Sequence, residues 1–170
     1  CALPFFGRLE HADLVVKAFV ESDPEPLIAF MDECNEKRKQ IQRGIVEEAR
    51  ALARLYPDDP VLILGGDWHP GVVGIAASKI AEEFWRPTWL FQIKDGVCKG
   101  SARSIKGFDV TAAMGEQKDL FTKFGGHAAA GGFTFPLENL EPLRQRLNAS
   151  AERRRAADPS LWQSRIAYDC

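Results

Sequence analysis

The chain has 170 residues, with 45% hydrophobic and 27% charged residues and a formal net charge of −2. This length supports one well-buried core rather than two full-sized domains, and the composition is that of an ordinary globular protein. No apolar run approaches the roughly 20 residues that cross a bilayer, so we expect a cytoplasmic protein without a membrane partner.

The cysteines and histidines are not spaced like metal ligands. The four cysteines form no Cys-x-x-Cys pair, and the three histidines stand far apart. Neither a disulfide framework nor a complete metal site is therefore predicted within this chain. Because the chain is slightly acidic overall, any contact with nucleic acid has to be local, and between Lys94 and Lys123 six cations outnumber four acids.

Two helices are predicted in the first third of the chain. An amphipathic helix is expected from His11 to Val20, and a longer one from about Pro26 to Tyr56, where Pro57 stops it. A helix of the second length often links two domains, although an ordinary surface helix has the same pattern. The abrupt apolar start of the chain favours a linker helix in a fragment of a longer protein.

From residue 61 the pattern changes to alternating strands and helices. Val61–Leu64 is a short apolar run typical of a strand buried on both faces, and a glycine-bearing turn leads into a helix over 72–84. Pro87–Ile93 and Val97–Ser104 predict two further strands, joined by a hairpin turn at Asp95-Gly96. We therefore expect an α/β domain of three layers, in which a small mixed sheet is flanked by helices.

The second half of the chain predicts shorter elements. Asp109 is the expected N-cap of a short helix from Val110 to about Met114, and a helical stretch follows around 118–124. A strand at Gly132–Phe135 precedes an amphipathic helix over 137–157.

These elements predict the domain organisation. Residues 58–157 are the expected folded domain, and residues 1–57 the helical linker from a missing domain. Residues 158–170 are expected to be a linker towards a following domain, because Trp162 has no evident partner in the chain.

Two short segments carry candidate ligand contacts. Trp68 and His69 lie in the glycine-bearing turn, where they either contact a ligand or cap the core edge and bond to backbone. Ser101 and Arg103 are two residues apart on a strand, so they project to the same face. A hydroxyl beside a planar guanidinium suits phosphate oxygens, whereas a solvated edge strand is the alternative.

The run Phe124–Gly132 contains two glycine pairs around one histidine and three alanines. Glycine is used where φ is positive or where a ligand approaches the main chain, and consecutive N–H groups form concavities that bind anions. His127 is the only side chain in the run that can hydrogen-bond or carry charge near neutral pH. The alternative is a tight turn of small residues packed under a helix.

Three motifs in this order resemble the RecJ family of single-strand-specific DNA exonucleases, in the DHH phosphoesterase superfamily. They are Trp68–Ser78, Lys99–Ser104 and Phe124–Gly131, and the resemblance covers roughly residues 4–148. It implies a DHH-associated substrate-binding domain, joined by the long helix to the catalytic DHH domain of the same polypeptide. The DHH domain of the family holds Mn²⁺ or Mg²⁺, and no Asp-His-His occurs here. The implied metal cofactor therefore belongs to the parent protein, and this chain is expected to hold none.

The same resemblance implies a function and a set of site residues. The implied parent is a hydrolase, a 5′-to-3′ exonuclease of DNA repair and recombination, and its implied partner is single-stranded DNA. His127 is the candidate catalytic side chain, acting as a hydrogen-bond donor to substrate rather than as a base. Phosphate contacts are implied for Arg8, Ser101, Arg103, Ser104, Gly125, Gly126 and His127. Further substrate contacts are expected at Trp68, His69 and Lys99.

Two other functions stay open at this point. Domains of this kind also occur in alanyl-tRNA synthetases, where they bind tRNA, so an RNA-binding module is one alternative. A phosphodiesterase of short oligonucleotides or cyclic dinucleotides, which shares the Gly-Gly-His element, is the other. If the chain is the substrate-binding part of an exonuclease, we expect no nuclease activity from this chain alone.

Overall fold

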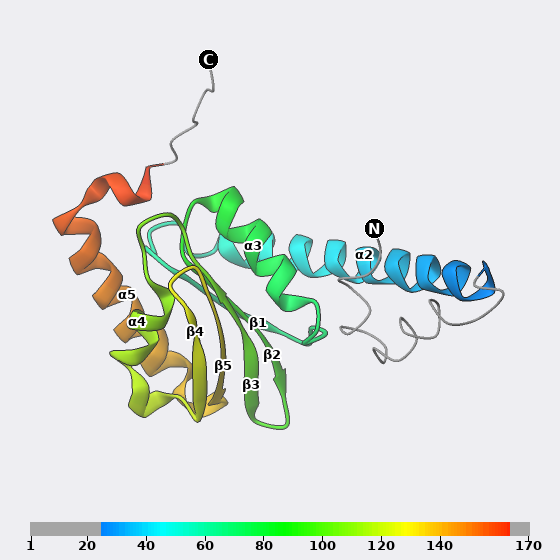
Figure 1. Cartoon of the computed structure of the whole chain (residues 1–170). Helices are drawn as coiled ribbons and strands as arrows, with labels where there is room; N and C mark the ends of the chain where they lie inside the picture. The colour runs from blue at the N-terminus through cyan, green and yellow to red at the C-terminus, as the bar shows by residue number, and fades with distance from the viewer. Residues whose placement is uncertain (1–24, 164–170) are drawn as a thin grey trace, which may run out of the picture.

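The computed structural model describes residues 25–163 and shows a three-layer α/β domain with a long N-terminal helix (Figure 1). A five-stranded sheet forms the middle layer. Helices α4 (Val110–Gly115) and α5 (Leu140–Ala157) cover one face, and α2 (Glu25–Ala53) and α3 (Val73–Phe84) lie on the other. The predicted fold class and the long helix are confirmed. In this part of the chain, no helix combines the length and the apolarity needed to cross a membrane.

The middle layer is a mixed sheet. Its strands are, in chain order, β1 (Leu62–Gly66), β2 (Thr88–Lys94), β3 (Val97–Arg103), β4 (Lys123–His127) and β5 (Ala130–Pro136). Their spatial order is β1-β2-β3-β5-β4, with β1 parallel to β2 and all other neighbours antiparallel. The crossover between the two parallel strands is α3. At the β2–β3 turn Asp95 and Gly96 have φ of 51° and 74°, which confirms the predicted hairpin turn.

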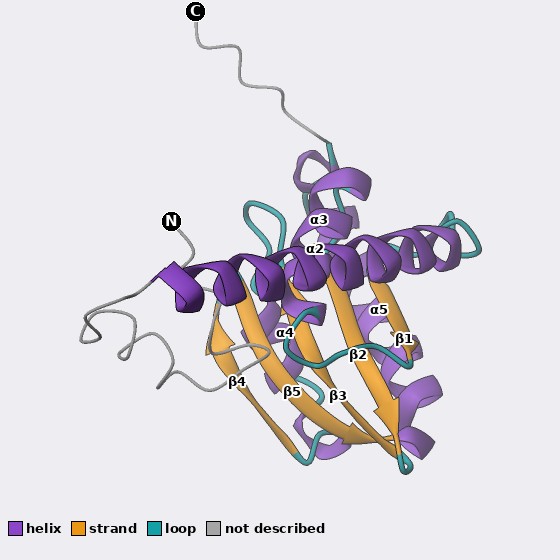
Figure 2. Cartoon of the chain, turned by 90° about the vertical axis from the view of Figure 1, so that its right-hand side faces the viewer, coloured by secondary structure: helices purple, strands orange, loops and turns teal. Residues whose placement is uncertain are grey.

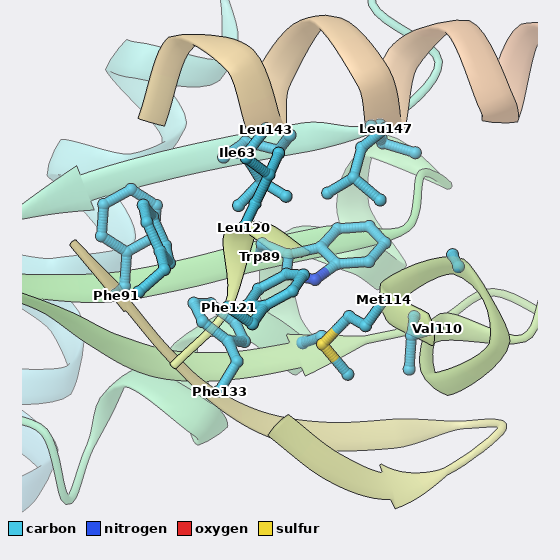
Figure 3. Packing of buried hydrophobic residues seen from close by; sticks show 14 of the residues in the cluster. Ile63, Trp89, Phe91, Val110, Met114, Leu120, Phe121, Phe133, Leu143 and Leu147 are labelled. Carbon is cyan, nitrogen blue, oxygen red and sulfur yellow. The ribbon is translucent and has the colours of Figure 1, made fainter. Parts of the chain in front are cut away.

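The larger core lies between the sheet and helices α4 and α5. Trp89 and Phe91 of β2 are fully buried there, beneath Leu143 and Leu147 of α5 (Figure 3). Phe135 of β5 meets Phe91 edge to face, with ring centroids 5.2 Å apart. Burial of each of these side chains stabilises the fold by about 2 to 3 kcal/mol, so this core holds the sheet against α4 and α5.

A second core joins the sheet to α3 and to the C-terminal half of α2. Small and branched residues of α3, including Ala76, Ala77 and Ile80, are fully buried where this helix packs against β2 and β3. Arg50 of α2 forms an ion pair of 2.6 Å with Glu83 of α3. The N-terminal half of α2 extends past α3, away from the sheet (Figure 1).

Three predicted boundaries are wrong. The helical stretch expected at 118–124 is a single 3₁₀ turn, η2 (Lys118–Leu120), because Lys123 and Phe124 pair across the sheet with β5. The same pairing extends β5 back to Ala130. The last helix begins after a further 3₁₀ turn, η3 (Leu137–Asn139). The helix predicted from His11 to Val20 lies outside the described residues.

The prediction that Trp162 lacks a partner is also wrong. It lies in η4 (Pro159–Trp162), where its ring meets Phe108 edge to face with centroids 5.8 Å apart. Its indole N–H donates to the carbonyl oxygen of Pro60 at 2.8 Å. The first turn after α5 therefore belongs to the folded unit, because a partly buried aromatic ring and its hydrogen bond hold it there.

Candidate functional site

Among residues 25–163, nothing covers one part of the sheet on the side of α3. This helix packs against β2 and β3, whereas β5 and β4 lie beyond it. Figure 2 views this side, with β3, β5 and β4 visible below α2. Cys98 and Ala102 of β3 are buried in the larger core on the opposite side of the sheet. Because side chains alternate along a strand, Lys99, Ser101 and Arg103 lie on the side of α3. We call this surface the open face; its residues are Lys99, Ser101, Arg103, Lys123, Gly125, His127, Ala130, Gly132 and Thr134.

The sheet register arranges the open face in three parallel rows. We name them the tip row, Arg103–Ala130–His127, the glycine row, Ser101–Gly132–Gly125, and the lysine row, Lys99–Thr134–Lys123. Neighbouring members of a row are one strand spacing apart, and neighbouring rows are about 7 Å apart along the strands. The two outer rows thus carry all the cationic and imidazole groups, and the middle row is almost bare backbone.

The glycines of the two pairs have different reasons to be glycine. A Cβ atom on Gly125 would meet nothing within 4 Å, and one on Gly132 would meet only the carbonyl oxygen of Gly100, at 3.9 Å. Gly126, in contrast, has a φ of 150°, and its Cβ would lie 2.4 Å from the carbonyl oxygen of Ala130. Gly131 is constrained less strictly, because its Cβ would lie 2.7 Å from Cε at the end of the flexible Met114 side chain and 3.1 Å from the carbonyl oxygen of Gly125. Packing within the described residues thus requires glycine at Gly126, favours it at Gly131, and does not explain Gly125 or Gly132.

The predicted pair Ser101 and Arg103 does lie on one face, next to the start of α3. A Cβ atom on Gly74 would lie 2.9 Å from Nη2 of Arg103 and 3.1 Å from Oγ of Ser101. The absence of a side chain at Gly74 therefore lets both groups approach the helix. Because β3 pairs with β2 on one side and β5 on the other, the alternative of a solvated edge strand is excluded.

Two hydrogen bonds to other groups of the protein orient the guanidinium of Arg103. Its Nε donates to Oγ of Ser78 at 3.1 Å, and its Nη1 donates to the carbonyl oxygen of Ala102 at 2.8 Å. The Ser78 hydroxyl in turn donates to the carbonyl oxygen of Gly74. Sequence reasoning did not select Ser78. The available signal was its spacing of four residues from Gly74, which places both on one face of α3.

The Gly-Gly-His run forms the edge strand β4 and the tip of the hairpin that leads into β5. Its tip is fixed from outside the hairpin through three successive carbonyl oxygens. Thr111 Oγ1 donates to His127, the Val110 N–H to Ala128 and the Ser104 N–H to Ala129, at 2.9, 3.0 and 2.9 Å. The loop that follows Arg103 and the first residues of α4 therefore connect the two ends of the tip row, while the His127 side chain stays exposed.

Replacing Thr111 by valine is expected to loosen the hairpin tip. The substitution removes the hydrogen bond to the His127 carbonyl, worth about 1 kcal/mol, so amide hydrogen exchange at the tip should accelerate about fivefold. Thr122→Val is the matched control, because it deletes an exposed hydroxyl beside the same strand. Unchanged exchange at residues 126–129 in Thr111→Val would contradict this role.

Three other candidate residues have structural partners. Trp68 is only 3% exposed and donates from Nε1 to Glu48 at 2.7 Å, so its ring caps the core and the predicted stacking on a ligand is wrong. The His69 ring is exposed, and its Nδ1 accepts from the Gly71 N–H at 3.2 Å. The Ser104 hydroxyl donates to the carbonyl oxygen of Phe108 at 2.5 Å, which commits it to the loop rather than to a ligand. Candidate Arg8 lies outside the described residues.

The open face offers anion binding. Burial raises the pKa of the Cys98 thiol on the core side of β3 to about 11, so this group is protonated at neutral pH. Among residues 25–163, no three His, Cys, Asp or Glu side chains are grouped so as to hold a metal ion. The groups that face outwards are a guanidinium, two ammonium groups, an imidazole and hydroxyls, a set suited to phosphate oxygens.

Comparison with known proteins gives a family match. Residues 58–153 match the model of the DHHA1 domain. Over 153 residues the chain is 37% identical to the single-stranded-DNA-specific exonuclease RecJ of Bacillus subtilis, covering 86% of this chain and 20% of that protein. It is 35% identical over 150 residues to the protein of the same name from Escherichia coli, covering 82% and 26%.

A solved structure shows the same fold. The crystal structure of RecJ from Thermus thermophilus in complex with Mn²⁺ superposes with a TM-score of 0.79 at 25% identity. The match covers 89% of this chain and 23% of that one. A second structure of the same protein, in complex with Mg²⁺, gives the same TM-score. The chain thus spans about a fifth to a quarter of the length of the relatives that it matches.

Proposed function

Because this chain belongs to the DHHA1 domain family, we propose that it binds the phosphates of single-stranded DNA as the substrate-binding part of a metal-dependent 5′-to-3′ exonuclease. In this proposal residues 58–157 hold the substrate, with the packed turn up to Trp162 completing the domain. Residues 1–57 link it to a catalytic DHH domain, and residues 158–170 lead towards a following domain.

One observation carries the proposal: the glycine row is bare where the chain itself does not need glycine. A Cβ atom at Gly125 or Gly132 would make no contact closer than 3.9 Å within the described part of the chain, yet both positions lack a side chain beside Ser101 and Arg103. Open glycines next to a fixed guanidinium suit close approach of a ligand to the backbone. A phosphodiester fits this surface, since its oxygens accept from a planar guanidinium and from a hydroxyl.

The roles of individual residues follow from their places in the rows. Ser101 and Arg103 bind one phosphate from one side, and His127 donates a hydrogen bond to the same group from across the tip row. The backbone of Gly125 lies under the phosphate. Gly126 allows β4 to pair closely with β5, because a Cβ atom there would lie 2.4 Å from the carbonyl oxygen of Ala130. His69 and Lys99 are exposed, and in this proposal they contact the flanking nucleotides.

The chemistry of cleavage is assigned to metal ions of the parent protein. The residues described here do not fit a metal site, whereas the RecJ of T. thermophilus was crystallised with Mn²⁺ or Mg²⁺. Two-metal hydrolysis activates water and stabilises the leaving oxygen of a phosphodiester. The part played by this chain is to bind the phosphate and to hold it in line for attack, which lowers the entropic barrier of the reaction.

A binding comparison tests the proposal. Fluorescence anisotropy should show that the chain binds 5′-phosphorylated single-stranded DNA, with an affinity that falls as salt rises. Tighter binding to structured RNA would favour the RNA-binding alternative, and a preference for dinucleotides or cyclic dinucleotides would favour the small-phosphodiesterase alternative. Incubation of pure chain with Mn²⁺ should release no nucleotides; hydrolysis would overturn the division of labour between the domains.

A further inference from the structure

We propose that the lysine row, Lys99–Thr134–Lys123, is a second phosphate site, which takes the neighbouring phosphate of the strand bound at the tip row. This inference rests on the proposed function, since it extends the same binding surface. It commits the open face to an oligonucleotide with successive phosphates, as opposed to a single phosphate group or a mononucleotide.

The register of the sheet places these three residues together. Thr134 pairs with Lys99 on one side and with Lys123 on the other, so the threonine stands between two lysines. All three lie on the open face, because each is two residues from a member of the glycine row on its own strand. The two lysines come from segments 24 residues apart in sequence and approach only through β5.

The charges of this row are not balanced within the described part of the chain. Lys99 and Lys123 are exposed, and neither ammonium group takes part in a side-chain hydrogen bond or ion pair among residues 25–163. Two strand spacings, about 10 Å, separate their backbones, so the flexible side chains can reach one anion between them. The carboxylate of Asp119, four residues before Lys123 in sequence, is engaged by Arg146 at 2.7 Å.

The glycine row connects this site to the first one. On the open face, Ser101 is the only residue of β3 between Arg103 and Lys99. Gly125 is likewise the only open-face residue of β4 between His127 and Lys123. A nucleic-acid backbone lying along the strands therefore passes from the phosphate above Gly125 to the lysine row, and the only side chain of the glycine row on this path is that of Ser101. Each outer row supplies cations to one phosphate, and Thr134 supplies a hydroxyl to the second.

This arrangement predicts different effects on two ligands. Lys123→Ala in the 170-residue chain should weaken binding of a short 5′-phosphorylated oligothymidylate about threefold, and Lys99→Ala combined with Lys123→Ala about tenfold. The slope of log affinity against log salt should fall by about 0.7 for each lysine removed. Binding of inorganic phosphate should stay unchanged in both variants. Lys118→Ala removes the same charge from η2 and should alter neither ligand.

The outcomes separate this inference from the function on which it rests. If Lys123→Ala and the double variant bind oligothymidylate like the wild type, with an unchanged salt slope, while Arg103→Ala weakens both ligands, the second site is refuted and the first stands. If both lysine variants also lose inorganic phosphate, the lysine row is part of the first site and the inference fails. If the wild-type chain binds neither ligand, both proposals are overturned.

Discussion

Replacement of Gly125 by valine is expected to weaken binding of single-stranded DNA at least tenfold while the fold stays intact. The new side chain would stand on the open face, where its Cβ has no neighbouring atom within 4 Å among the described residues, so it would occupy the space proposed for the phosphate. Valine is also a better strand residue than glycine, so the free energy of unfolding should change by no more than about 1 kcal/mol. Tenfold in affinity corresponds to about 1.4 kcal/mol. Anisotropy titration and urea denaturation measure the two quantities separately.

The neighbouring glycine provides the matched control. Valine at Gly126 would be forced to a φ of 150° with its Cβ 2.4 Å from the carbonyl oxygen of Ala130, so it should destabilise the domain by about 3 kcal/mol. Gly125→Val should thus weaken DNA binding in a stable domain, whereas Gly126→Val should lower the stability of the domain itself. Retention of full affinity by a folded Gly125→Val chain would contradict the proposed position of the phosphate.

Removal of the Arg103 guanidinium is the second change with a large expected effect. Arg103→Ala deletes a charge-assisted contact to phosphate worth about 2 to 3 kcal/mol, which corresponds to a loss of affinity of about 30- to 150-fold. The salt dependence of binding should become shallower by about 0.7 in slope. Arg103→Lys should restore little affinity, because an ammonium group cannot replace the planar fork that Ser78 orients. Salt-dependent anisotropy titrations with all three chains measure this.

Arg146→Ala is the control for this experiment. It removes the same charge from α5, where Arg146 is paired with Asp119 at the surface, so DNA binding should not change. Thermal unfolding of each variant distinguishes lost binding from lost structure, because Arg103 also bonds to Ser78 and to the Ala102 carbonyl. An unchanged affinity and salt slope in a folded Arg103→Ala chain would remove Arg103 from the site.

Local signals were enough to predict most of the elements. The apolar run that becomes β1, the helix start after the glycine-bearing turn and the Asp95-Gly96 turn each depend on residues close in sequence. Strand alternation alone placed Ser101 and Arg103 on one face. The same local reasoning could not find that 123–127 is a strand, since its propensity is low and only pairing with β5 makes it one.

The sequence by itself determined the fold class, the long helix and a pair of phosphate-binding candidates on one strand. Only the tertiary structure decided which glycines have open space beside them, that Trp68 caps the core, that Ser78 bonds to Arg103, and that Thr134 pairs with Lys123. The physical reason is that turns and helices depend on neighbours within a few residues, whereas a row across three strands depends on register. Register is set by the packing of the whole sheet, which brings Lys99, Thr134 and Lys123 together from distant parts of the chain.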